Sequence, residues 1–145
     1  MHAAQQYYSA AVPSGSGGAI VSWFDTRDGA NGIYAQRVSR GGSLLWTADG
    51  VPLCIQTNVQ TDYRIIPDGA GGAIVAWQAW PVDNMNIYAQ RIDSSGAVLW
   101  GPNGVAVCTA SGDQRYPRLV SDGAGGAIVT WYDFRGGIFE VFAQR

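Results

Sequence analysis

Residues 68–77 read DGAGGAIVAW, and the pattern returns as SGSGGAIVSW at residues 14–23 and as DGAGGAIVTW at residues 122–131. The glycine-rich half requires positive φ angles, which glycine adopts readily, so it predicts a tight turn. The following half is almost continuously apolar, as in a strand that is covered on both faces. Each copy therefore predicts a turn followed by a buried β-strand.

These copies belong to an internal repeat with a period of 54 residues and no gap. A fixed period of this size is typical of propellers and repeat arrays. We divide the chain into a lead at residues 1–5, full copies at residues 6–59 and 60–113, and a shorter third copy of 32 residues at 114–145.

In the second copy we expect strands at residues 64–67, 73–77 and 87–92, and a fourth that begins at residues 97–100 and continues irregularly to residue 108. Four short antiparallel strands with apolar residues on both faces describe one blade of a β-propeller. We therefore predict an all-β fold of four-stranded propeller blades, the third of them incomplete. A β-solenoid is the main alternative, although its coils are usually shorter than this repeat.

The composition agrees with this fold class and argues against several partners. Only 14% of the residues are charged, all nine basic residues are Arg, and Glu140 is the only Glu, so good helix formers are scarce. A net charge of −2 without a basic run argues against duplex nucleic acid. The apolar stretches are too short to span a bilayer, and no secretory leader is recognisable, so we expect no membrane insertion. The compartment stays open, with a secreted or cell-surface parent favoured.

Residues 121–135, with the Ala-Gln-Arg triplet that follows them, resemble the tandem propeller repeats of secreted or surface-attached bacterial and archaeal proteins. The hairpin at residues 93–100 also resembles the Asp-box turn of sialidase-type propellers and the Gly…Trp hairpin of quinoprotein-like propellers. It departs from the Asp box because its Gly-to-Trp spacing is one residue too long. The resemblance implies a propeller over nearly the whole chain but no particular activity, since propellers host many unrelated functions.

The number of copies predicts association. Propellers close with about four to eight blades, whereas this sequence supplies two full blades and a third that lacks its fourth strand. An open stack would expose an apolar face and an unpaired edge. We therefore expect a homo-oligomer, with two chains forming a six-bladed ring, or a place within a longer array.

Most recurring side chains predict structure rather than chemistry. We expect the aromatic rings to pack between blades and the arginines to form hydrogen bonds, with an arginine cluster for a carboxylate or phosphate ligand as the alternative. Cys54 and Cys108 are expected to be free, buried thiols, because stacked sheets lie too far apart for a disulfide. The recurring structural set is Trp23, Trp77, Trp131, Trp46, Trp100, Arg37, Arg91 and Arg145.

The loops that follow the apolar strand break the repeat and are the best candidates for a binding face. By resemblance, they share a rim with the connections between copies. The candidate ligand-binding residues on this rim are Asp25, Arg27, Trp80, Asp83, Asp133, Phe134 and Arg135. We expect local ion pairs within Asp25–Arg27 and Asp133–Arg135. Trp80 beside Asp83 suits stacking on a sugar ring, unless the loop folds back over the blade or against a neighbouring chain.

Residues for catalysis or for metal binding do not converge in the sequence. No nucleophile–base pair recurs, His2 is the only His, and the glycine turns fit neither a calcium loop nor a dinucleotide fingerprint. We therefore predict no catalytic residue, no metal and no cofactor. The predicted function is a non-catalytic propeller repeat module, a structural and interaction scaffold with a glycan or protein ligand. A lectin-like glycan binder is the alternative, and a glycosidase-like enzyme ranks third.

Overall fold

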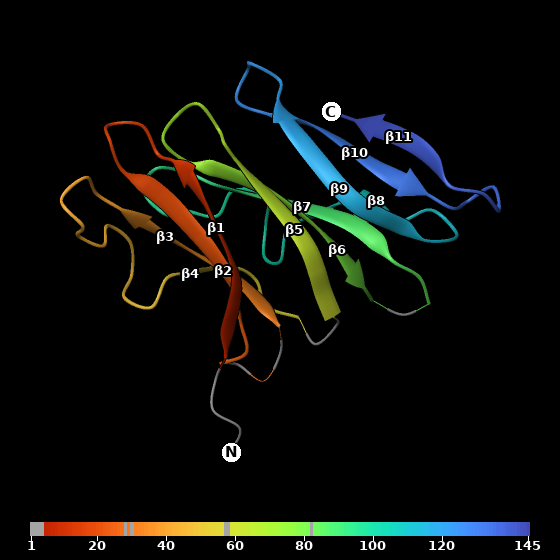
Figure 1. Ribbon diagram of the computed structural model, residues 1–145, viewed down its shortest axis with the longest axis horizontal. Helices are drawn as coiled ribbons and strands as arrows, with labels where there is room; N and C mark the ends of the chain where they lie inside the picture. Colours follow the sequence, from red (N-terminus) through yellow and green to blue (C-terminus); the bar gives the residue numbers. More distant parts are fainter. Residues whose placement is uncertain (1–4, 28, 30, 57–58, 82) are drawn as a thin grey trace.

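The computed structural model describes residues 5–27, 29, 31–56, 59–81 and 83–145, which form eleven β-strands and no helix (Figure 1). Residues 1–4 of the expected lead, with His2, and residues 57–58 of the first connection between copies lie outside the described residues. No described segment forms a helix that is long and apolar enough to cross a membrane.

The strands form three antiparallel sheets, each arranged as a meander. The first sheet contains β1 (Gln6–Pro13), β2 (Ala19–Asp25), β3 (Gly32–Val38) and β4 (Val51–Cys54). The second contains β5 (Val59–Pro67), β6 (Ala73–Trp80), β7 (Asn86–Ile92) and β8 (Val105–Cys108). The third contains β9 (Gln114–Ser121), β10 (Ala127–Asp133) and β11 (Glu140–Gln144). The all-β prediction is confirmed, and the described residues do not close into a ring.

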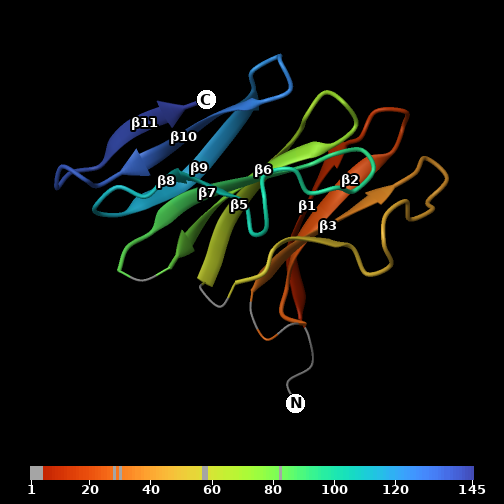
Figure 2. The same cartoon turned by 180° about the vertical axis from the view of Figure 1, so that it is seen from behind.

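The three sheets stack in chain order and fan out from the side where their first strands lie (Figures 1 and 2). There β1 lies next to β5, and β5 lies next to β9. Successive copies of the repeat therefore place equivalent strands side by side along the stack.

Two hydrophobic cores fill the spaces between the sheets. The first joins one face of β2 to β6, with the residues Ile20, Phe24, Ala73, Val75 and Trp77. The second joins the opposite face of β6 to β10, with the residues Ile74, Ala76, Ala127, Val129 and Trp131. The middle strand β6 is buried along its whole length except at Trp80, as its continuous apolar sequence predicts.

The predicted start of the fourth strand is wrong. Residues 97–100 hold only an isolated bridge between Ile92 and Val98, whereas the strand that pairs with β7 is β8. The side chain of Gln90 replaces the strand ladder in this region: its Oε1 accepts the Trp100 N–H over 3.0 Å, and its Nε2 donates to the Gly101 carbonyl over 2.7 Å.

The first strand of each copy also begins earlier than predicted. In β5 the pairing with β6 breaks between Thr61 and Arg64 and then resumes, so the strand extends back to Val59. Asp62 lies within this break with a φ of 44°. The break has the character of a β-bulge, which inserts residues without ending the strand.

The recurring aromatic and arginine side chains make contacts both within and between the sheets. Each apolar-strand Trp stacks on the aromatic residue opposite it, with centroid distances of 6.2 Å for Trp23–Tyr34, 6.2 Å for Trp77–Tyr88 and 6.3 Å for Trp131–Phe142. The arginines bind the glycine turns: Arg91 to Asp68 over 2.9 Å, Arg145 to Asp122 over 2.7 Å, and Arg37 to the Ser94 carbonyl over 2.8 Å. In the first copy Ser14 replaces the turn aspartate, and Arg37 donates both to the Ser14 carbonyl over 3.5 Å and to the Ser94 carbonyl of the next sheet.

Both cysteines are free, but only Cys54 is buried. The prediction of a buried thiol is wrong for Cys108, which is partly exposed. The side chain that lies over Cys108 is itself partly exposed: the Arg135 guanidinium approaches the Cys108 sulfur to 3.3 Å.

Candidate functional site

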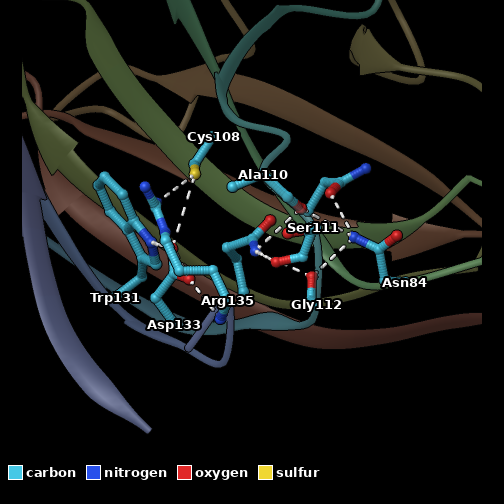
Figure 3. A network of polar contacts seen from close by, with 10 residues as sticks. Asn84, Cys108, Ala110, Ser111, Gly112, Trp131, Asp133 and Arg135 are labelled. Atoms are coloured by element: carbon cyan, nitrogen blue, oxygen red, sulfur yellow. Dashed lines mark hydrogen bonds and ion pairs between the residues drawn. The ribbon is translucent and has the colours of Figure 1, made fainter. Parts of the chain in front are cut away.

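The predicted rim is formed where the connection between β8 and β9 lies against two neighbouring loops. Asn84, from the β6–β7 loop, donates to the carbonyls of Ala110 over 3.2 Å and Gly112 over 2.7 Å. On the other side, the Phe134 N–H donates to the Asp113 carbonyl over 2.8 Å. The contacts of Asn84 and the adjoining cluster around Asp133 are drawn in Figure 3. The structure thus joins loops from the second and third sheets at one edge.

Asp133 is the centre of a charged cluster at this edge. Its side chain has no exposed surface. It accepts hydrogen bonds from the Trp131 indole over 2.8 Å and from the Arg135 guanidinium over 2.6 and 2.9 Å (Figure 3). The guanidinium also stacks 4.1 Å above the Phe142 ring. These hydrogen bonds, that of Arg135 above all, outweigh burial and hold the Asp133 pKa well below its usual range.

The first sheet repeats this cluster. Asp25 is buried, forms an ion pair with Arg27 and accepts a hydrogen bond from the Trp23 indole over 3.1 Å. The Arg27 guanidinium lies 4.4 Å from the centre of the Tyr34 ring. Its hydrogen bond to Asp25 is the largest cause that keeps the pKa of that carboxyl well below its usual range. The expected ion pairs are thus present in both sheets.

The second sheet has Ala79 and Pro81 where the other two carry Asp and Arg. Both charges of the pair are therefore replaced together, and no carboxylate is left without its guanidinium at this position. This pattern fits a structural role, because a buried carboxylate is costly unless it is paired.

The predicted rim residues thus separate into two groups. Asp25 and Asp133 are buried, and their carboxylates are bonded within the protein. Trp80, Asp83 and Phe134 are exposed, with 46% of Trp80 and 40% of Phe134 accessible. Arg27 and Arg135 lie between the groups, since each covers its aspartate and keeps part of its guanidinium in solvent. A ligand at this rim would therefore contact the exposed residues Trp80, Asp83 and Phe134.

One recurring feature was not predicted from the sequence. Tyr8, Asp62 and Tyr116 occupy equivalent positions of the repeat, and all three have positive φ angles, of 51°, 44° and 57°. They lie on β1, β5 and β9, and residues of β1 and β5 line a cleft of about 610 Å³ at this level. Positive φ normally favours Gly, Asn or Asp, so Asp62 fits this preference but the two Tyr residues do not, and the three amino-acid types carry no common signal.

Metal coordination finds no support in the described part of the chain, where no group of three or more His, Cys, Asp or Glu residues comes together. Comparison of the chain with protein-family models, with curated proteins and with solved structures finds no match.

Proposed function

We propose that this chain is a non-catalytic β-propeller repeat module that acts as a structural and interaction scaffold, and that it self-associates, with two chains forming a six-bladed ring. The observation that carries this proposal is the outer face of the third sheet. It is apolar and exposed, although the equivalent faces of the first two sheets are buried in the cores.

The contrast in burial is large at equivalent positions. Ile20 and Ile74 have no exposed surface, whereas Ile128 is 40% exposed. Tyr132 on the same face is 50% exposed, and Val120 and Val141 extend the exposed apolar surface onto β9 and β11. Monomeric proteins rarely leave a large contiguous apolar surface in water, so a face of this kind marks an interaction surface.

The chemistry of the rim supports a role without catalysis. A general acid or base needs an accessible group whose pKa lies near the working pH. Asp25 and Asp133 are buried, ion-paired and have strongly lowered pKa values.

The mass in solution tests this proposal. Light scattering over a hundredfold range of concentration is expected to give twice the 15.4 kDa mass of one chain. A soluble monomer at every concentration would contradict self-association. Measurable turnover of sialosides, abolished by Glu140→Gln, would contradict the non-catalytic assignment.

A lectin-like glycan binder is the second candidate, and the exposure of Trp80 beside the exposed Asp83 favours it. An accessible indole offers an apolar face to a sugar ring, and a carboxylate accepts hydrogen bonds from its hydroxyls. Glycan-array binding that is lost in Trp80→Ala but kept in Tyr116→Ala, an exposed aromatic on β9, would support this candidate. Absence of glycan binding in the unmodified protein would exclude it.

A further inference from the structure

Each sheet has two faces that can be named from the stack. We call the face toward the next sheet in chain order the forward face and the face toward the preceding sheet the rear face. On the second strand of each sheet, the forward-face residues are Ile20, Ser22 and Phe24; Ile74, Ala76 and Gln78; and Ile128, Thr130 and Tyr132. The rear-face residues are Ala19, Val21 and Trp23; Ala73, Val75 and Trp77; and Ala127, Val129 and Trp131.

We infer that the exposed forward face of the third sheet binds the rear face of the first sheet of a second copy of this chain, so that copies join head to tail. This inference rests on the proposed self-association and adds which two surfaces meet. It predicts an interface between two different surfaces, rather than one surface that pairs with itself.

The two cores inside the chain provide the pattern. In both, a forward face packs on a rear face: Ile20 and Phe24 lie in one core with Val75, and Ile74 lies in the other with Val129 and Trp131. The forward face contributes a protruding Ile, and the rear face contributes small residues around one Trp. This complementarity of large and small side chains recurs at both interfaces.

Polar contacts fix the same arrangement. In the first interface the Ser22 hydroxyl donates to the Tyr63 hydroxyl over 3.2 Å, and the Trp46 indole donates to the Ser94 carbonyl over 3.2 Å. In the second, the Gln78 side-chain oxygen accepts the Tyr116 N–H over 2.6 Å. Hydrogen bonds as well as apolar contacts therefore fix how neighbouring sheets are aligned.

Two complementary surfaces at the ends of the stack are left uncovered by the described residues. The forward face of the third sheet carries the exposed Ile128 and Tyr132. The rear face of the first sheet carries Ala19, Val21 and Trp23, which are half-buried, whereas the equivalent residues of β6 and β10 are buried. The sequence repeat makes the first sheet's rear face similar to the two rear faces already covered.

The surroundings of two equivalent glycines also show that the rear side of the first sheet is uncovered. A Cβ added to Gly96 would lie 2.9 Å from the Trp46 ring of the preceding sheet. Gly42 is the equivalent glycine of the first sheet, and a Cβ there would meet nothing within 4 Å. The preceding sheet therefore covers Gly96 in the second copy, whereas no described residue covers Gly42 in the first.

Two variants separate head-to-tail joining from other modes. Ile128→Arg blocks the forward face and Val21→Arg blocks the rear face; Leu99→Arg, at an exposed side chain in the β7–β8 connection, is the matched control. Far-ultraviolet circular dichroism and thermal unfolding of each variant establish that it is folded. Native mass spectrometry then measures the assemblies of each variant alone and of the two blocked variants mixed in equal amounts, one carrying a mass tag.

Head-to-tail joining predicts that each blocked variant alone is monomeric, because every interface then lacks one partner surface. The mixture forms a one-to-one heterodimer through the two surfaces that remain intact, and Leu99→Arg assembles like the unmodified protein. A dimer of Val21→Arg alone, with none for Ile128→Arg and no heterodimer, would show forward face against forward face and overturn the inference. Assembly of both blocked variants alone would place the interface elsewhere, and that result would leave the proposed self-association intact. A monomeric unmodified protein would overturn both proposals.

Discussion

The indole N–H of Trp131 donates to the carboxylate of Asp133 over 2.8 Å, and the two residues lie on the same buried face of one strand. Residues two apart in a strand point to the same side, so the Trp places its polar edge beside the acid. Trp23 and Asp25 repeat this geometry in the first sheet over 3.1 Å. A charged group is therefore built into the rear face of each of these two sheets and is neutralised by the Arg two residues later.

We expect Asp133→Asn to destabilise the fold. The substitution removes the negative charge and leaves Arg135 and the Trp131 indole with a weaker acceptor, at a cost of about 1–3 kcal/mol for a hydrogen-bonded, partly screened pair. Urea denaturation measures the change in the free energy of unfolding. The matched control is Asp83→Asn, an exposed position where the change should stay within about 0.5 kcal/mol. Equal effects of the two substitutions would contradict this account of the cluster.

We expect stability to fall in acid. Hydrogen bonds from the arginines hold the Asp25 and Asp133 pKa values well below their usual range in the folded state. As the pH falls below the unfolded value of about 3.9, the unfolded chain binds protons first, so the free energy of unfolding decreases. It should be nearly constant above about pH 5, where both states are ionised.

Urea denaturation at pH 7, 5, 4 and 3 measures this dependence. The double variant Asp25→Asn with Asp133→Asn should show a smaller loss between pH 5 and pH 3 than the unmodified protein. Asp122, whose pKa is lowered to about 2 by hydrogen bonds from Ala124, Arg145 and Gly126, retains part of the dependence in the variant. An unchanged slope in the variant would show that other carboxyls govern acid unfolding.

Two glycines in one loop are expected to respond differently to alanine. Gly101 and Gly104 both have a φ of 81°. A Cβ at Gly101 meets nothing within 4 Å, whereas at Gly104 it would lie 2.5 Å from the Ala89 carbonyl and 2.6 Å from the Trp77 ring. Gly101→Ala should therefore cost only the backbone strain of about 1–2 kcal/mol, and Gly104→Ala should cost about 1–3 kcal/mol more. Thermal or urea unfolding measures both; equal costs would mean that the loop moves to relieve the clash.

The two thiols are expected to react at different rates with Ellman's reagent. Burial raises the pKa of Cys54 to about 12, so almost no thiolate forms at neutral pH. Cys108 is partly exposed and lies near the Arg135 guanidinium. One thiol per folded chain should react quickly and both should react in denaturant, with the fast phase absent in Cys108→Ser. A fast phase that persists in Cys108→Ser would place Cys54 at the surface.

The exposed rim residues could be located from the sequence because they interrupt the repeat. Trp80 stands where the other copies carry Thr26 and Phe134, and the structure leaves its side chain exposed. The accessibility of the acids could not be predicted in the same way. Asp25 and Asp133 follow loop-like patterns, and only the packing of Trp and Arg around each one shows that it is buried.

The sequence by itself determined the repeat, the glycine turns and the buried apolar strands. These features depend on local backbone preferences and on side-chain alternation, which a single chain records directly. Tertiary structure alone decided which strand pairs with β7, where the bulges at Tyr8, Asp62 and Tyr116 lie, and which faces of the three sheets stay uncovered. These depend on contacts that the repeat pattern does not record, such as the hydrogen bond from the Trp100 N–H to Gln90 and the exposure of Ile128, whose face no described sheet covers. A repeated sequence gives each sheet the same potential contacts, and its place in the stack decides which of them are made.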